Sequence, residues 1–338
     1  MTNSSKQDDR YKETFLNKKV MVTGGLGFIG SNLARILVSL GSDVLLVDCL
    51  IPEHGGNIHN ILGIDKKVTI NIADLRDANS MNHLVKGVDY IFNLAGQISH
   101  MDSMTNPLFD LEVNIRAHLI LLEACRKNNS DVKIIYTGTR QIYGKPLYLP
   151  VDEQHPIRPI DINGVNKYAG EWYHIVYHEA YGMRTASLRL TNTYGPRMLM
   201  MHNRGGFVSW FIRQALDNEE ITIFGDGKQT RDFNYVDDVC EALLKAGASE
   251  DVNGQIFNLG GNERLSLIDF TKLLIDICKS GSYRLVPFPS ERKKIDIEDY
   301  YGTFSKIRTI LGWEPKITLE DGLRRTIDFY NINKAHYW

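Results

Sequence analysis

The sequence has few cysteines and no pairing pattern among them. Its four cysteines lie far apart, without a CxxC pair or the spacing of a disulfide framework: Cys49, Cys125, Cys240 and Cys278. We therefore expect reduced thiols and a cytoplasmic location. No apolar run reaches transmembrane length, and residues 1–10 are polar without the apolar core of a signal peptide, so we expect no membrane contact.

Strong charge of either sign is also missing. The chain carries 39 Lys and Arg against 41 Asp and Glu, a formal net charge of -2, and no basic run compensates for it. This balance argues against nucleic acid as a partner. We also expect no metal site. With 338 residues, the chain is long enough for one large core or two smaller ones.

What the sequence does have is a glycine cluster directly after a strand-like apolar run, residues 19–23. The glycines are Gly24, Gly27 and Gly30, and a helical pattern of apolar residues follows them. This spacing allows a tight turn and leaves the free N–H groups of a helix start for a phosphate. A second apolar run, residues 43–47, ends on Asp48, at the distance where an acid holds an adenosine ribose. The stretch therefore predicts a dinucleotide site.

Strand-like and helical patterns alternate through the first half of the chain. Strands are expected at 19–23, 43–48, 67–71, 89–94, 132–137 and 184–190, and helices at 30–41, 77–85, 106–128 and 163–181. Such alternation predicts an α/β, Rossmann-type doubly wound parallel sheet. Beyond residue 191 the alternation loosens, with helices expected at 205–217, 236–249 and 266–279 and strands at 221–224 and 255–259, which suggests a smaller mixed lobe.

These patterns divide the chain into an arm, a main domain and a lobe. Residues 1–17 are expected to form a flexible N-terminal arm or short helix, and residues 18–191 the cofactor-binding domain. Segments from about 232–260 are expected to return to that domain. Residues 192–231 and 261–338 then make the substrate-binding lobe.

Several motifs occur in a fixed order. They are the glycine loop, Asp74-Leu75, Asn93-Leu94-Ala95-Gly96, Asn114, Tyr136-Thr137-Gly138-Thr139, Ile142-Tyr143-Gly144, Lys167, Arg189 to Arg197, Gly225 to Phe233 and Leu311 to Pro315. On these motifs the chain resembles the extended short-chain dehydrogenase/reductase family of nucleotide-sugar epimerases and dehydratases. The resemblance implies NAD as cofactor and a nucleotide-diphosphate sugar as substrate. It also implies a homodimer formed through the helices at 106–128 and 163–181.

The resemblance assigns the cofactor-binding residues. Asp74 would accept from the adenine amino group, and Ala95 and Gly96 would let the nicotinamide ribose and the pyrophosphate lie close to the chain. Asp48 favours NAD over NADP, because a carboxylate repels a 2′-phosphate. The full implied set is Gly24, Gly27, Phe28, Ile29, Gly30, Asp48, Asp74, Leu75, Leu94, Ala95, Gly96, Asn114, Thr137 and Lys167.

The catalytic residues depart from the family's pattern at one position. The family uses a Ser or Thr, a Tyr and a Lys, the last two as Tyr-x-x-x-Lys. Here Thr139 takes the place of the Ser or Thr, and Lys167 takes the place of the Lys. Asn163 stands four residues before Lys167, where the pattern has Tyr. An asparagine amide cannot take a proton. Asn163 also fits as the N-cap of the helix that follows it.

Three interpretations of this departure stay open. The protein oxidises and reduces a nucleotide sugar with another group moving the proton, such as Lys167, Tyr143, His100 or a water. Alternatively, it catalyses a subfamily reaction, such as a dehydrogenase's net oxidation, in which that proton step is reassigned. The third interpretation is a protein that binds NAD and a sugar nucleotide with little turnover.

The residues after Thr139 narrow the reaction. Dehydratases of the family carry an Asp-Glu pair there, whereas this chain has Arg140 and Gln141, so 4,6-dehydration is not expected. We expect a 4-epimerase-like activity; the run Leu94 to Gln97 also looks like that of the 2-epimerase that makes CDP-tyvelose. The residues implied for the substrate are Gln97, Asn192, Phe207, Arg231 and Arg292, with Asp296 near the nucleotide ribose.

Overall fold

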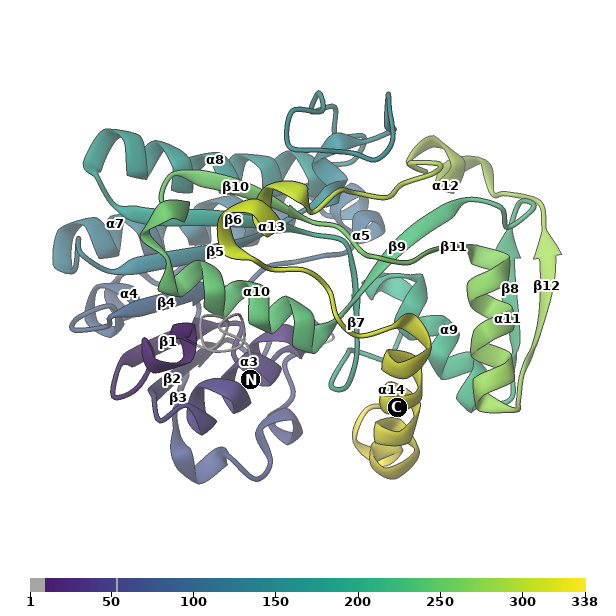
Figure 1. Cartoon of the computed structure of the whole chain (residues 1–338), viewed down its shortest axis with the longest axis horizontal. Coiled ribbons are helices and arrows are strands. Elements are labelled where there is room, and N and C mark those ends of the chain that lie inside the picture. The colour runs from purple at the N-terminus through teal and green to yellow at the C-terminus, as the bar shows by residue number, and fades with distance from the viewer. Residues whose placement is uncertain (1–9, 53) are drawn as a thin grey trace.

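The computed structural model describes residues 10–52 and 54–338, and its main feature is a seven-stranded sheet (Figure 1). The strand order is β10-β6-β5-β4-β1-β2-β3, and every neighbouring pair is parallel. The strands are β1 (Lys19–Thr23), β2 (Asp43–Asp48), β3 (Val68–Ile72), β4 (Tyr90–Asn93), β5 (Lys133–Thr139), β6 (Arg184–Leu190) and β10 (Gln255–Leu259). The predicted doubly wound α/β fold is confirmed.

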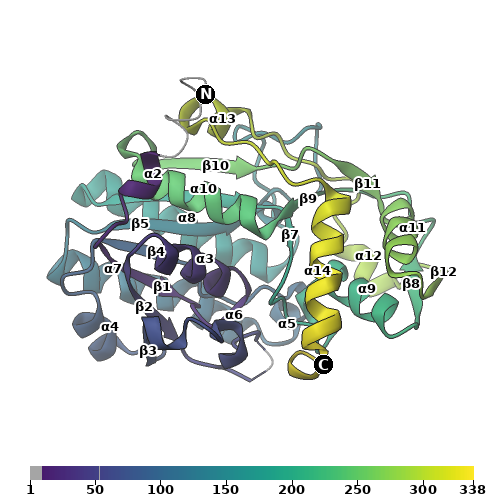
Figure 2. The same ribbon diagram turned by 60° about the horizontal axis from the view of Figure 1, so that its bottom comes forward.

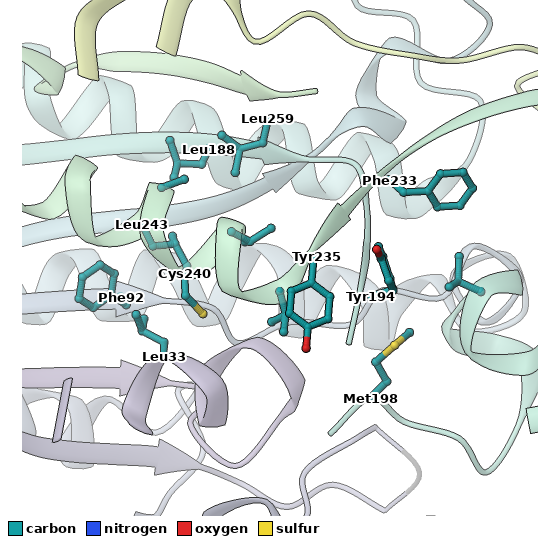
Figure 3. Close-up of a cluster of buried hydrophobic side chains, with 14 of the residues drawn as sticks. Leu33, Phe92, Leu188, Tyr194, Met198, Phe233, Tyr235, Cys240, Leu243 and Leu259 are labelled. Atoms are coloured by element: carbon teal, nitrogen blue, oxygen red, sulfur yellow. The ribbon is translucent and has the colours of Figure 1, made fainter. Parts of the chain in front are cut away.

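Helices cover both faces of this sheet. One face carries α3 (Phe28–Ser39) and α10 (Val236–Ala248), and the other carries α4 (Ala78–Leu84), α7 (Ala117–Asn128) and α8 (Ile162–Tyr181). Leu33, Phe92, Leu188 and Leu243 meet in the core on the first face (Figure 3). Apolar residues of α7 pack on Met21 and Ile134 on the second. Burial of these apolar stripes fixes both layers.

The helix expected at 106–128 is interrupted by a wider turn. Helix α5 (His100–Thr105) precedes α6 (Pro107–Leu111), which runs through a π-helical turn (Glu112–Arg116) directly into α7. Such turns often mark functional sites. Here the turn carries the buried Asn114.

A smaller lobe lies beyond the ends of the central strands (Figure 2). It holds a three-stranded sheet, β11-β9-β7, and a parallel pair, β12-β8. Their bounds are β7 (Asn192–Tyr194), β8 (Glu220–Phe224), β9 (Thr230–Tyr235), β11 (Arg264–Ser266) and β12 (Ser282–Val286). The helices after residue 191 that are not yet named are α9 (Phe207–Leu216), α11 (Leu267–Cys278), α12 (Ser290–Lys294), α13 (Ser305–Leu311) and α14 (Leu319–Asn333).

Residues 10–17 belong to the segment for which an arm or a short helix is expected, and they pack on the main body. Helix α2 (Arg10–Glu13) lies near α10, and Phe15 is fully buried against Tyr90 and Phe92. Residues 1–9 of the expected arm lie outside the described residues. Across the described part of the chain, no helix combines the length and apolar character that a membrane crossing requires.

Candidate active site at the carboxyl ends of the strands

The glycine loop joins β1 to α3 and forms a cradle of backbone. Gly24 adopts a left-handed φ of +65°, and a Cβ on Gly30 would overlap the carbonyl of Gly24. The N-cap of α3 is Gly27, with no side chain capping the helix, so the N–H groups around Phe28 and Ile29 face outward from the helix start. The loop therefore fits a pyrophosphate held by backbone N–H groups.

Asp48 lies at the end of β2, beside this loop. Its carboxylate accepts hydrogen bonds from the backbone N–H of Leu26 (3.1 Å) and of Leu50 (2.9 Å). Burial raises the pKa of Asp48, and these N–H donors partly offset that effect. The carboxylate therefore lies beside the glycine loop, where the sequence predicts a contact with the ribose of the cofactor.

Asp74 follows β3 and forms an ion pair with Arg76. Arg76 donates to Oδ2 of Asp74 at 2.6 Å, and this hydrogen bond holds the pKa of Asp74 below its usual value. The neighbouring Leu75 is buried. Asp74 therefore stays an anionic acceptor at neutral pH, which the expected contact with an adenine amino group requires.

The loop after β4 is held from both sides. On one side, Leu94 N and Ala95 N donate to the hydroxyl of Thr23 at 3.0 and 3.1 Å. On the other, Asn114 exchanges two hydrogen bonds of 3.1 Å with the backbone of Gln97. The chain between these contacts, around Gly96, is thereby fixed in position.

Lys167 reaches from α8 to the middle of this loop. A Cβ on Gly96 would overlap the Lys167 ammonium, so any larger residue would displace the ammonium from this position. Lys167 is buried, and this burial lowers its pKa to about 8, against a partial opposing effect of Asp110. A lysine with such a pKa can exchange a proton near neutral pH.

Asn163 is almost fully buried one helical turn before Lys167. Its Nδ2 donates to the carbonyl of Gln97 (3.0 Å), to Gln97 Oε1 (3.2 Å) and to Asp110 Oδ2 (3.0 Å). Asn166 donates to the other oxygen of Asp110 at 2.7 Å. Two amide side chains, Asn163 and Asn166, therefore satisfy the buried carboxylate of Asp110.

The expectation that Asn163 caps α8 is wrong. The N-cap is Asp161, whose Oδ1 accepts from the backbone N–H of Gly164 at 2.7 Å. The same carboxylate holds His100, with 2.5 Å between Oδ2 and Nδ1 of the ring. The other ring nitrogen of His100 contacts the amide of Gln141.

Tyr143, named from the sequence as a candidate proton-transfer group, is buried with its hydroxyl engaged on both sides. Its hydroxyl donates to Asn258 Oδ1 (2.7 Å) and accepts from Arg189 (2.5 Å). Arg189 in turn forms a buried ion pair with Glu171. Burial raises the pKa of Tyr143 to about 12. Thr139, by contrast, ends β5, and Thr137 lies two residues earlier on that strand.

The residues expected to bind substrate lie in two groups, one around Asn192 and Arg231 and the other around Phe207 and Arg292 in the lobe. Asn192 accepts from Arg140 at 3.0 Å and donates to the carbonyl of Asp232 at 2.8 Å. Arg231, next to Asp232, faces Asp296 at 3.4 Å, and burial lowers its pKa to about 10. Farther out in the lobe, Phe207 begins α9 among the rings of Phe211, Phe233 and Phe270, and Arg292 of α12 stacks on Phe224.

Three residues of the site were not identified from the sequence as site residues: Asp110, Asp161 and Arg140. An N-cap signal ahead of the helix could have pointed to Asp161, because Asp is favoured there and Gly164 follows three residues later. Nothing local marks Asp110, whose partners lie more than 50 residues away on α8.

Comparison with known proteins agrees with this geometry. A model of the NAD dependent epimerase/dehydratase family matches residues 20–260. The chain is a member of this family. A putative UDP-glucose 4-epimerase of Methanocaldococcus jannaschii is 35% identical over 316 residues, which cover 93% of this chain and 99% of that protein.

Two further relatives of the family show how far its members diverge. UDP-glucuronic acid decarboxylase 1 of Xenopus tropicalis is 32% identical over 94% of this chain and 73% of its own length. The solved UDP-glucose 4-epimerase of Thermus thermophilus in complex with NAD is 31% identical, with a TM-score of 0.83 over 93% of this chain and 99% of that chain.

The cofactor is NAD, and the glycine cradle and Asp48 fit it. When bound, it supplies a hydride acceptor and donor. Among residues 10–52 and 54–338 there is no group of three His, Cys, Asp or Glu side chains arranged to hold a metal ion.

Proposed function

We propose that this protein is an NAD-dependent epimerase of a UDP-linked sugar, acting at C4 of the sugar ring. The names of the M. jannaschii and T. thermophilus relatives support the nucleotide and the carbon. The observation that carries the proposal is the buried Lys167 ammonium against Gly96 in the loop after β4. Within the described residues the Lys167 ammonium forms no ion pair, and its lowered pKa suits proton exchange.

In this proposal Lys167 itself moves the proton. Its pKa of about 8 leaves a usable fraction of neutral amine at physiological pH, which can accept the proton of the sugar hydroxyl and return it. Thr139 orients that hydroxyl by a hydrogen bond. Asn163 holds Gln97 and Asp110 and so keeps the loop beside Lys167 in place; it takes no proton.

His100 is assigned a positioning role. Both of its ring nitrogens already have partners, Asp161 and Gln141, so the ring is held rather than free. This arrangement fixes the start of α5 against the start of α8, on either side of the expected sugar.

The lobe supplies the nucleotide contacts in this proposal. Arg231 and Asn192 meet the diphosphate, because a guanidinium matches phosphate oxygens in shape and charge. Phe207 lies near the base, and Arg292 and Asp296 complete the nucleotide site.

The test is an NADH absorbance spectrum of the purified protein with UDP-glucose, UDP-galactose and UDP-glucuronic acid, followed by product analysis. We expect a transient NADH signal and a 4-epimer from at least one sugar. Lasting NADH with an oxidised product would instead indicate a dehydrogenase. Bound NAD with neither signal nor product would refute the enzyme and favour a binding protein.

We also propose a homodimer formed through α6 and α8. Both helices expose large apolar side chains, namely Leu108, Leu111, Val165, Trp172 and Val176. Trp172 is 40% exposed and Leu108 is 73% exposed, whereas Ile175 of the same helix is buried in the core. An apolar face of this kind on neighbouring helices is suited to a second copy of the chain.

A further inference from the structure

Leu26, in the middle of the glycine loop, is held through both polar groups of its backbone. Its N–H donates to the Asp48 carboxylate at 3.1 Å. Its carbonyl accepts from the backbone N–H of Asn57 (3.0 Å) and from Nδ2 of Asn60 (2.8 Å). Because Leu26 directly precedes Gly27, the N-cap of α3, these contacts fix the peptide that leads into the pyrophosphate cradle.

The amide of Asn60 is itself oriented by Tyr337, which lies 277 residues later in the sequence. Asn60 is fully buried, and its Oδ1 accepts from the Tyr337 hydroxyl at 2.6 Å. This contact leaves Nδ2 as the group that faces Leu26. Burial raises the pKa of Tyr337 to about 12, so its hydroxyl keeps the proton that it donates to Asn60.

Tyr337 belongs to a short segment that contacts both the lobe and the cofactor domain. The segment follows α14, which lies between the main body and the lobe (Figure 2). On the lobe side, the indole N–H of Trp338 donates to Asp217 at the end of α9, at 2.6 Å. On the cofactor side, the ring of His336 stacks on that of His59, with 3.7 Å between the ring centroids. The hydroxyl of Tyr337 is thus held in place from both sides.

We propose that Tyr337 is a positioning residue for NAD, because it orients Asn60 and Asn60 holds the glycine loop in the form that receives the pyrophosphate. A loop that already has its binding form costs less ordering when the cofactor binds. Without the Tyr337 hydroxyl, Oδ1 of Asn60 would be a buried acceptor without this donor, and the amide would gain by turning away from Leu26. This role concerns the cofactor and is independent of the reaction at the sugar.

The experiment measures NAD affinity by equilibrium dialysis of the NAD-loaded protein against a series of NAD concentrations. Tyr337→Phe should bind NAD about 3- to 30-fold more weakly than the wild type, since it removes one buried hydrogen bond and leaves its acceptor unpaired. Urea unfolding of the same variant reports the accompanying loss of stability.

Tyr330→Phe is the matched control. Tyr330 is also buried, and its ring lies 5.3 Å from that of Tyr337, but its hydroxyl donates to the carbonyl of Met198 at 3.0 Å. The control variant therefore loses a similar hydrogen bond in the same aromatic cluster without touching Asn60. It should lose stability as Tyr337→Phe does and keep the NAD affinity of the wild type.

A double-mutant cycle tests whether Tyr337 acts through Asn60. Asn60→Ala should weaken NAD binding at least as much as Tyr337→Phe, because it removes the donor to Leu26. Adding Tyr337→Phe to Asn60→Ala should then change the affinity by no more than about 2-fold. If Asn60→Ala does not fold, the comparison of Tyr337→Phe with Tyr330→Phe decides alone.

Three results would overturn the inference. One is an unchanged NAD affinity in Tyr337→Phe. Another is an equal loss of affinity in Tyr330→Phe, which would make the effect one of general stability. The third is a cycle in which Tyr337→Phe lowers the affinity by the same factor with Asn60 and with alanine at that position.

Discussion

Replacing Lys167 with methionine should strongly reduce turnover and at the same time make the protein more stable. The pKa of Lys167 is lowered from 10.5 to about 8, chiefly by burial, and Asp110 offsets only part of the cost. A shift of this size corresponds to about 3 kcal/mol at 1.36 kcal/mol per pKa unit. Methionine is similar in length and carries no charge to desolvate, so Lys167→Met should recover much of that energy.

The sign of this effect depends on pH in a defined way. Below pH 8, Lys167 is protonated in both states, and folding bears the full cost of burying the charge. Between pH 8 and 10.5 the unfolded chain still holds a proton that the folded protein has released, so the stability of the wild type rises with pH. The advantage of Lys167→Met should therefore be largest at pH 7 and vanish near pH 10.5.

The assay pairs urea unfolding at pH 7 and at pH 10 with the NADH signal of a single turnover. Turnover should fall by about 100- to 10,000-fold, the usual contribution of a general base. In the wild type, the rate of NADH formation should rise with pH through about 8, as the neutral amine appears.

Lys133→Met is the matched control. Burial also lowers the pKa of Lys133 to about 8, but its ammonium donates to the carbonyl of Ser249 (2.6 Å) and to Asn253 at the other end of β5. The variant should lose stability through these acceptors and keep its turnover. Retained turnover in Lys167→Met, or a loss of stability at pH 7, would refute the reasoning for Lys167.

Substitutions at three further positions test other parts of the structure. Asn163→Asp places a second carboxylate beside Asp110, and the repulsion raises the pKa of one of the two carboxyl groups. The free energy of unfolding of this variant should therefore fall as pH rises from about 5 to 7. Asn163→Ala should instead lose about 1–3 kcal/mol of stability at both pH values. If the free energies of unfolding of these two variants depended on pH in the same way, this account would be wrong. Asp161→Ala should lose about 1 kcal/mol more than Asp161→Asn, because asparagine keeps the helix cap; equal midpoints would show that the cap contributes nothing. Trp172→Glu should be a monomer by light scattering, and a persisting dimer would exclude α8 from the interface.

The central sheet could be predicted because its strands are marked locally. Buried parallel strands are continuous apolar runs, and all six expected before residue 191 are present within a few residues of their expected bounds. Strands β7, β9, β11 and β12 were not predicted. Strands β7 and β11 are only three residues long, and β9 and β12 mix polar with apolar residues, so their strand form depends on pairing with distant segments. Arg264, for example, pairs with Asp232.

The candidate site likewise has one part that local sequence motifs predict and another part that depends on distant contacts. The spacing of the glycines and of Asp48 forms a motif that can be read from the sequence, so the cofactor-binding part of the site could be predicted. Asn163 was noticed because it breaks a pattern, but its partners could not be known. Its amide is used by Asp110 and Gln97, which lie 53 and 66 residues away, and the cap it was expected to form is made by Asp161.

Helix α6 connects the exposed apolar face with the buried side of the candidate site. It is only five residues long, yet it exposes Leu108 and Leu111 on one side and buries Asp110 on the other. A partner covering the two leucines would restrain the helix whose carboxylate fixes Asn163 and Asn166. In the proposed dimer, assembly would therefore restrain the loop around Gln97, and a monomeric variant should show a looser Gln97 loop as well as a lost interface.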